Sequence, residues 1–528
     1  MMLVSLLRFP SLRIVSLRIA LAAALSVACG AVAAKPLGEA DARHLLARTG
    51  FGPAPSEIAA YAPLSRDDAI EQLLAGVKTT SATPPPEWTR ETGPLRTTPA
   101  ALATEADRKA FQQEQASRVR ELRAWWMREM LVTPSPLTER MTLFWHNHFV
   151  SSQQKVRVGR LLYAQNAMFR ARSLGSFATL LHAAATDPAM VIYLDSVQNR
   201  KGTPNENFAR EVMELFTLGQ GHYDEQDVKE AARAFTGWSI DRDTGTFVVR
   251  PRLHDTGEKA IFGRFGQFAG DAVLDLLLAR PETAEFIVGK LWREFVSPDP
   301  DSREVRRIAV AFRESNYDLK VALRNLLQSP AFWAADNRGS LIKSPVEIVV
   351  GSLRQLDVTA DDTLALALVT AGMGQNLFAP PNVRGWPGGD VWINSNTLLA
   401  RKQFLDRLAR NDAGPPPGGR TMMRSPAAST ATPEPVATDS AMTMTRDATV
   451  EEMARAARVA RQIDRGTRGL RFDAAQWIAQ CPGDTRERKM DAAARALLPI
   501  AAQLPPTPDA DMTSAIYAML LDPAYQLK

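Results

Sequence analysis

Apolar residues recur at a spacing of three and four positions along most of the chain, which is typical of helices that bury one face. This periodicity predicts helices over 41–49, 55–76, 101–133, 137–150, 161–172, 177–186, 272–278, 282–295, 302–315, 319–327, 345–356 and 363–373. Alternating patterns are scarce, and the best pair, 246–250 and 258–262, predicts one hairpin joined through Asp255-Thr256-Gly257. The predicted fold is therefore mainly α: a multi-helix globular domain with at most a small β-hairpin.

The stretch 203–238 carries the densest polar pattern, with eleven Asp, Glu, Arg, Lys and His residues in thirty-six positions beside an apolar stripe. Thr203 followed by Pro204 and Glu206 predicts a capped helix start, and Gly219 predicts its end. Asp224 predicts the cap of a second helix, which Gly237 would end. A tight connector between two helices would then hold His222 and Tyr223.

The ends and the interior of the chain differ in composition. Three arginines, the apolar run 19–27 and a small-residue cleavage pattern at 31–33 predict a secretory signal peptide over 1–33. An uncleaved anchor is the alternative, but the sixteen residues 19–34 fall short of the roughly 20 that span a bilayer. A lipoprotein signal through Cys29 is weaker still, because Ser26 stands where such signals usually carry Leu. We expect a helical domain over 34–410, a disordered Pro/Ala/Ser/Thr-rich insertion over 411–446, and a C-terminal helical segment over 447–528 that packs on the main domain.

Charge and cysteine content exclude several classes of protein. Without residues 1–33 the chain has 60 basic and 58 acidic residues, and no run of Lys and Arg points to nucleic acid. No second apolar segment is long enough for a transmembrane span. Cys481 would be the single remaining cysteine, which excludes a cysteine-based metal site and a redox dithiol. We expect an exported protein of the periplasm or cell surface that is stabilised by its core.

Ordered motifs along residues 40–410 resemble DUF1800, a bacterial family of unknown function. The motifs are His44-Leu45-Leu46 with Gly50-Phe51-Gly52, Phe144-Trp145-His146-Asn147-His148-Phe149, Asp187-Pro188-Ala189-Met190 with Tyr193-Leu194-Asp195, Pro204-Asn205-Glu206-Asn207-Phe208-Ala209-Arg210-Glu211, Gly221-His222-Tyr223, Thr236-Gly237-Trp238, His254-Asp255, Lys343-Ser344-Pro345, and Pro380-Pro381-Asn382-Val383-Arg384-Gly385-Trp386-Pro387-Gly388-Gly389. The resemblance implies an exported helical protein, and a partner that is another exported protein encoded nearby. It implies no activity, substrate or catalytic residue.

The candidate catalytic residues lie on one polar helix face: Asn207, Arg210, Glu211 and Glu214. In the functional interpretation they line a pocket in which a Glu is a general base and Arg210 binds an anion. In the structural interpretation Glu206, Arg210 and Glu214 form an exposed salt-bridge ladder, which contributes about 0.3–0.5 kcal/mol per pair. Sequence leaves both open.

Histidine and carboxylate residues are candidate ligands of a divalent metal ion: His146, His148, His222, His254 and Asp255. Two residues apart on a helix is about 200°, so His146 and His148 would not face the same ion unless the helix ends there. Capping by the acids after His222, and a turn role for Asp255, are the structural alternatives.

Three further residues are candidates for ligand binding: Tyr223, Arg384 and Trp386. Trp386 could stack on a sugar ring or seal the core. Standard catalytic, cofactor-binding and nucleotide-binding signatures are missing. The leading hypothesis is a binding or assembly component of the envelope; a metal-assisted hydrolase and a purely structural envelope protein are the alternatives.

Overall fold

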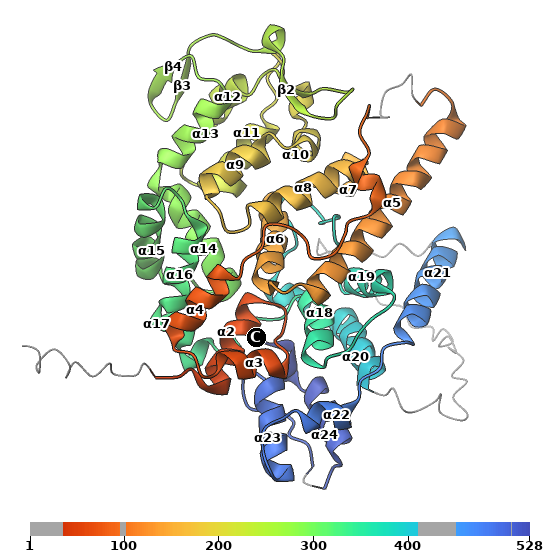
Figure 1. Ribbon diagram of the computed structural model, residues 1–528. Helices are drawn as coiled ribbons and strands as arrows, with labels where there is room; N and C mark the ends of the chain where they lie inside the picture. Colours follow the sequence, from red (N-terminus) through yellow and green to blue (C-terminus); the bar gives the residue numbers. More distant parts are fainter. Residues whose placement is uncertain (1–34, 96–101, 410–449, 508) are drawn as a thin grey trace, which may run out of the picture.

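The computed structural model describes residues 35–95, 102–409, 450–507 and 509–528 (Figure 1). The predicted signal peptide over 1–33 and the predicted insertion over 411–446 lie outside the described residues. Helices dominate the rest, which confirms the mainly α prediction. The helices are α2 (Gly38–Thr49), α3 (Pro55–Tyr61), α4 (Arg66–Ala75), α5 (Glu105–Val132), α6 (Pro136–His148), α7 (Gln153–Val156), α8 (Gly159–Ala171), α9 (Phe177–Ala185), α10 (Pro188–Tyr193), α11 (Asn207–Glu211), the π-helix η3 (Val212–Thr217), α12 (Glu225–Ala234), α13 (Gly270–Ala279), α14 (Pro281–Phe295), α15 (Ser302–Glu314), α16 (Leu319–Gln328), α17 (Pro330–Trp333), α18 (Pro345–Gln355), α19 (Thr363–Gly372), α20 (Ser395–Ala409), α21 (Val450–Thr467), α22 (Ala474–Ala479), α23 (Arg486–Leu497) and α24 (Met512–Leu521), with short 3₁₀ segments η1 (Glu87–Arg90), η2 (Ser196–Gln198), η4 (Pro251–Leu253), η5 (Ala335–Asn337), η6 (Gly389–Trp392) and η7 (Pro523–Gln526).

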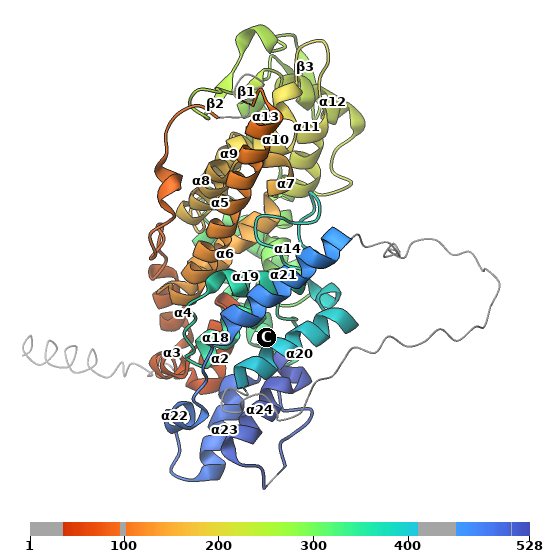
Figure 2. The same cartoon turned by 90° about the vertical axis from the view of Figure 1, so that its right-hand side faces the viewer.

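The apolar faces of these helices pack into two cores. One core joins α2, α6, α9 and α11–α16, and the other joins α5, α8 and α18–α20 with α22–α24. The long helix α5 packs along α19, and α21 packs on the same helix. Figures 1 and 2 place the strands at one end of the molecule and α22–α24 at the other.

The C-terminal segment is joined to the main body by backbone as well as side chains. The Lys343 N–H donates to Gln526 O at 2.8 Å, and the Lys528 N–H donates to Leu341 O at 2.8 Å. Ile342 and Leu527 form an isolated antiparallel bridge between these bonds. Among the described residues, no helix combines the length and the apolar character needed to cross a bilayer.

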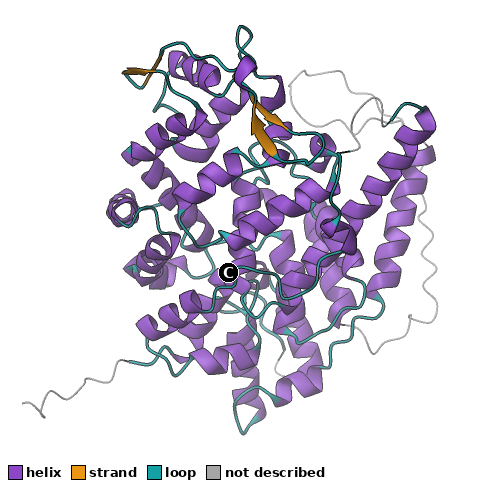
Figure 3. Cartoon of the chain, turned by 45° about the horizontal axis from the view of Figure 1, so that its top comes forward, coloured by secondary structure: helices purple, strands orange, loops and turns teal. Residues whose placement is uncertain are grey.

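The predicted pairing of 246–250 with 258–262 is wrong, because each segment belongs to its own hairpin (Figure 3). β1 (Trp238–Ile240) pairs with β2 (Phe247–Val249), and β3 (Lys259–Ile261) pairs with β4 (Arg264–Gly266). Gly245 and Gly263, with φ of +76° and +72°, make the two tight turns that favour these local partners.

The first helix of the 203–238 stretch begins at Asn207, three residues later than the predicted first helical position at Pro204. Asn199 Oδ1 accepts the Asn205 N–H at 2.9 Å, and Asn205 Oδ1 accepts the Asn207 N–H at 2.9 Å, so side-chain bonds take the place of helical backbone bonds before Asn207. The second helix begins as predicted: Asp224 caps α12 in a reciprocal capping box with Asp227.

Candidate functional site

The helix that follows Asn207 changes to a π-helix over Val212–Thr217. Such wide turns are rare and occur often at functional sites. Near a helix end the last carbonyls have no partner within the helix. Here side chains from other elements supply those partners: His148 Nε2 lies 3.1 Å from Phe216 O, and Lys290 Nζ lies 3.3 Å from Leu215 O.

His148 and Lys290 also contact each other, with 3.0 Å between His148 Nδ1 and Lys290 Nζ. Because a carbonyl oxygen can only accept, His148 Nε2 carries the proton and Nδ1 accepts from the lysine. Burial and the neighbouring Lys290 hold the pKa of His148 well below its usual range. Burial, with a smaller effect of Arg293, lowers the pKa of Lys290 to about 8. The pair is therefore a neutral imidazole beside a weakly basic amine.

Asn147, between the two histidines of α6, holds the glycine-rich loop that follows Asn382. Its Oδ1 accepts the Trp386 N–H at 2.6 Å, and its Nδ2 donates to Trp386 O at 3.4 Å. Gly385 has a φ of +86°, and a Cβ there would lie 2.2 Å from Asn147 Oδ1. Only glycine fits at this close approach of the loop to α6.

These elements enclose a cleft of about 520 Å³, here called the motif cleft. Its walls come from α6, α14, the start of α18 and the loop 384–392, and include Arg140, Phe144, Asn147, His148, Lys290, Arg293, Glu294, Ser344, Glu347, Arg384, Trp386, Asp390, Trp392 and Lys528. Trp386 and Trp392 are only 4% and 5% exposed, which favours core sealing over stacking on a sugar.

A buried ionic network forms one wall of the motif cleft. Arg140 bridges Glu294, at 2.5 Å, and Glu347. Lys528 Nζ reaches the same Glu347 at 2.5 Å. Despite the burial that opposes it, the attraction of Arg140 and Lys528 lowers the pKa of Glu347 to about 2, so this carboxylate stays ionised. Sequence reasoning missed this network.

The four predicted catalytic residues have different surroundings in the structure. Arg210 forms exposed ion pairs with Glu206 at 3.1 Å and Glu225 at 2.8 Å, which favours the ladder interpretation for this residue. Asn207 Nδ2 donates to Asp195 Oδ2 at 3.4 Å. Burial and the nearby Glu214 raise the pKa of the half-buried Glu211.

Glu214, by contrast, joins two of the predicted ligand-binding residues. It accepts from Tyr223 Oη at 3.1 Å and from Arg384 Nη2 at 3.1 Å. Burial, followed by the hydrogen bond to Glu214, raises the pKa of Tyr223 to about 12. Since Arg384 also lines the motif cleft, this cluster connects the 203–238 stretch to its rim.

The candidate metal ligands have separate surroundings. His146 is buried against Trp126, with Asn166 Nδ2 3.0 Å from its Nε2. His222 is exposed in its connector. His254 Nδ1 lies 2.9 Å from Thr236 O, and Asp255 pairs with Arg233 at 2.9 Å. Within the described ranges no three His, Cys, Asp or Glu side chains are placed to hold a metal ion.

A comparison with models of protein families shows to which family the chain belongs. The model described as "protein of unknown function (DUF1800)" matches residues 44–527. The chain belongs to the DUF1800 family. No curated protein and no solved structure matches it.

Arg140 and Lys290 complete the motif cleft of the DUF1800 chain. Both lie outside every motif identified in the sequence. Each occupies a charged position of an ordinary amphipathic helix, α6 or α14. Their partners are distant in sequence: Lys290 is 142 positions from His148. No local spacing could have revealed them.

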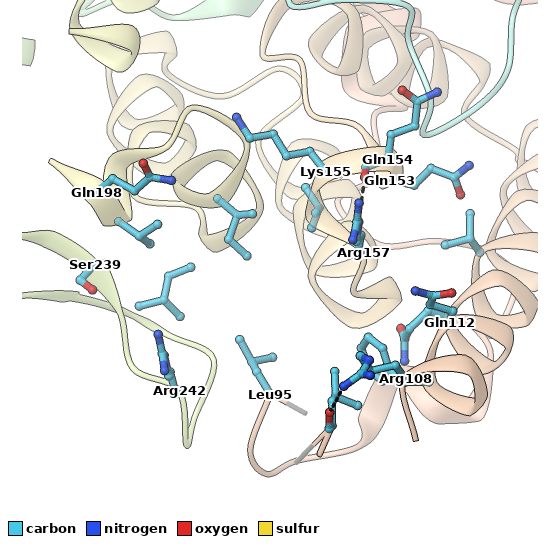
Figure 4. Close-up of a pocket in the computed structure, with 18 of the residues that line it drawn as sticks. Leu95, Arg108, Gln112, Gln153, Gln154, Lys155, Arg157, Gln198, Ser239 and Arg242 are labelled. Carbon is cyan, nitrogen blue, oxygen red and sulfur yellow. Dashed lines mark hydrogen bonds between the residues drawn. The ribbon is translucent and has the colours of Figure 1, made fainter. Parts of the chain in front are cut away.

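A second and larger hollow of the DUF1800 chain, about 1160 Å³, lies between α5, α7, η2 and the first hairpin. We call it the basic cavity. Figure 4 shows Arg242 and Ser239 on one side of it, Arg108 and Gln112 opposite, and Lys155 and Arg157 between them. Six cationic residues and five glutamines contribute to its lining, and none of its described lining residues is an acid: Arg108, Lys155, Arg157, Arg200, Arg242, Arg250, Gln112, Gln115, Gln153, Gln154 and Gln198.

Proposed function

We propose that this DUF1800 protein is an exported binding protein that holds an anionic amphiphile in the basic cavity. The observation that carries the proposal is the one-sided charge of the cavity: six cations and no carboxylate among its described lining residues, in a chain of nearly balanced charge. A concave surface of one sign attracts ligands of the opposite sign and concentrates them.

Most of these cations form no salt bridge within the part of the chain that the structure describes. Among the described residues, Lys155 is the one cation of the six that forms a salt bridge, to Asp195 at 2.6 Å. Arg157 Nε donates to Gln154 O at 3.1 Å, and Arg250 Nε donates to Ser239 Oγ at 3.1 Å. Bonds to carbonyl and hydroxyl oxygens orient a guanidinium but leave its charge in place, so an incoming phosphate or carboxylate gains attraction.

The apolar part of the lining selects the rest of the ligand. It is almost entirely aliphatic, with a single aromatic ring, from Leu95, Leu102, Phe111, Ala116, Val119, Val156, Ile192, Val197, Ile240 and Leu253. A site for neutral sugars usually offers aromatic faces for stacking and carboxylates for hydroxyl groups. Aliphatic walls beside cations fit an alkyl chain that carries a phosphate or carboxylate head group, because each buried methylene contributes about 0.8 kcal/mol.

Export is the second part of the proposal and rests on the signal-peptide pattern of residues 1–33. The aliphatic and cationic lining agrees with a role at the envelope, where anionic amphiphiles are abundant. Fractionation of cells that express the full chain with a C-terminal tag checks this part: the tagged protein should leave the cytoplasm and lose its first residues. Retention in the cytoplasm at full length contradicts export without affecting the binding proposal.

The binding test uses calorimetry of the chain without residues 1–33, with three probes that share a twelve-carbon chain. Dodecyl phosphate, below its micelle concentration, should bind, while dodecyl maltoside and dodecyltrimethylammonium should bind at least about tenfold more weakly, a difference of about 1.4 kcal/mol. Inorganic phosphate should also bind more weakly, because it lacks the alkyl chain. Higher salt should weaken the dodecyl phosphate complex.

A matched pair of double variants locates the site. Arg157→Gln with Arg242→Gln removes two cations of the basic cavity and should weaken dodecyl phosphate binding by about tenfold or more. Arg264→Gln with Arg303→Gln removes the same net charge at exposed positions outside the cavity and should change affinity by less than about twofold. Equal binding of the three dodecyl probes, or equal losses in the two double variants, refutes the proposal.

A further inference from the structure

The motif cleft shares no lining residue with the basic cavity, so it needs its own explanation. Its most unusual group is the Lys290 amine. The hydrogen-bond partners of this amine are His148 Nδ1 and Leu215 O, and neither carries a charge. A lysine ammonium at the edge of a core ordinarily has a carboxylate partner.

The acids that could serve Lys290 are engaged elsewhere. Glu294 lies one helical turn further along α14, at the spacing that favours a lysine–glutamate pair. Arg140 holds Glu294 and also Glu347, and Lys528 completes the coordination of Glu347. The network therefore neutralises two acids of the cleft and leaves Lys290 among uncharged acceptors. The positive charge of Arg293 further disfavours the protonated form of Lys290.

We propose that Lys290 is a reactive amine of the motif cleft that forms an imine with a small carbonyl compound bearing a carboxylate. The cleft volume of about 520 Å³ accommodates such a molecule, and Arg293 in its lining supplies positive charge for the carboxylate. Lysines in low-polarity surroundings beside other cations are the ones that react in this way.

The chemistry balances without an oxidant or reductant. The Lys290 Nζ lone pair attacks the carbonyl carbon and forms a C–N bond, and a proton passes from nitrogen to the former carbonyl oxygen. A second proton, from solvent, joins that oxygen, and its loss as water breaks the C–O bond and leaves a protonated imine. His148 Nδ1 accepts a hydrogen bond from Nζ and so fixes the position of the amine in the cleft.

The test traps the imine on the wild-type chain, so it does not depend on a variant that folds. The protein without residues 1–33 is treated with glyoxylate and cyanoborohydride at pH 7.5, and carboxymethylated lysines are located by peptide mass spectrometry. A pKa of about 8 leaves roughly 200 times more free amine at pH 7.5 than the ordinary value of 10.5. Allowing for restricted access, Lys290 should be labelled at least tenfold faster than exposed lysines such as Lys109 and Lys201.

Two other lysines are internal controls. Lys528 lines the same cleft, and burial lowers its pKa to about 8 as well, but its amine is held in an ion pair with Glu347, so it should be labelled slowly. Burial lowers the pKa of Lys343 to about 7, yet this residue packs over the Tyr525 ring away from the cleft lining and should also stay unlabelled. Labelling of Lys290 no faster than Lys528, or a preference for Lys290 that persists in urea, overturns the proposal.

Two further measurements test the roles of the charge and of the carboxylate. The rate of labelling at Lys290 should reach half its maximum near pH 8. Propanal, which lacks the carboxylate, should label Lys290 at least fivefold more slowly than glyoxylate, relative to Lys109. Equal relative rates for the two aldehydes overturn the proposed ligand class, and Lys290→Arg should abolish the fast-labelled site.

Discussion

Replacing Gly385 by alanine tests whether the close approach of the glycine-rich loop to α6 holds the motif cleft together. The residue has a φ of +86°, and a Cβ would lie 2.2 Å from Asn147 Oδ1 and 2.8 Å from Asn147 O. One of those atoms belongs to the backbone of α6, so a side-chain rotation cannot relieve the contact. The loop itself must move, and the bond from the Trp386 N–H to Asn147 Oδ1 must lengthen.

The expected loss of stability follows from these separate effects. A left-handed conformation costs an alanine about 1–2 kcal/mol. Overpacking against a rigid neighbour costs about 1–3 kcal/mol, and an unsatisfied buried N–H costs about 1–3 kcal/mol. Because relief of the clash is what breaks the hydrogen bond, the effects overlap, and we expect about 3–5 kcal/mol in total for Gly385→Ala.

Gly389 in the same loop is the matched control. It also has a positive φ, +55°, but a Cβ there would meet nothing within 4 Å. Gly389→Ala should therefore lose only the conformational part, about 1–2 kcal/mol. Urea unfolding followed by tryptophan fluorescence gives both free energies, and hydrogen exchange of the Trp386 amide should speed up in Gly385→Ala alone. Equal losses in the two variants would show that the close approach to Asn147 contributes nothing.

Two further predictions concern buried charge. Burial, with a smaller effect of Arg170, lowers the pKa of His146 to about 3, so the folded chain resists a proton that the unfolded chain binds near pH 6.5. The stability that depends on neutral His146 is complete above pH 6.5 and is lost toward pH 3, by up to about 1.4 kcal/mol per pH unit. In urea titrations at acid pH, His146→Gln should flatten this slope, whereas His222→Gln, at an exposed position, should keep it. An unchanged slope in His146→Gln contradicts the argument. Glu347→Gln leaves Arg140 and Lys528 without their shared carboxylate and should lower the free energy of unfolding by about 3–5 kcal/mol. Arg210→Ala, on an exposed ladder, should lower it by less than about 1 kcal/mol. Similar losses of the two variants in thermal or urea unfolding would refute the distinction.

Local signals predicted the helices well where the partners lie within one or two turns. The capping box of Asp224 and Asp227 and the end of the preceding helix before Gly219 depend on neighbours a few residues away, and the structure has both. The start at Asn207 was mispredicted because Asn199, eight positions earlier, supplies the competing hydrogen bond to Asn205. Likewise, the two hairpins follow from turn glycines, while the alternating pattern alone allowed the wrong pairing.

The candidate site shows the same limit at longer range. The spacing of His146 and His148 on one helix indicated that the two rings face different surroundings, and each indeed has its own partner, Asn166 or Lys290. Sequence carried no information on which of these partners would matter, because Lys290 and Arg140 have no motif of their own. Periodicity only marks them as charged positions on amphipathic helices.

The polar density of the 203–238 stretch therefore has two origins that sequence could not separate. Arg210 with Glu206 and Glu225, and the capping acids of α12, are solvated pairs that any surface helix could carry. Glu214 and the π-helix carbonyls differ, because each accepts from a side chain of another element: Arg384, Lys290 and His148. The wide helical turn presents its carbonyl acceptors to side chains of other elements, and that placement holds an uncharged imidazole and a weakly basic amine side by side. The hydrogen-bond partners of this stretch are thus set by where distant elements meet the π-helix, and the charge along the stretch itself mainly keeps its outer face in water.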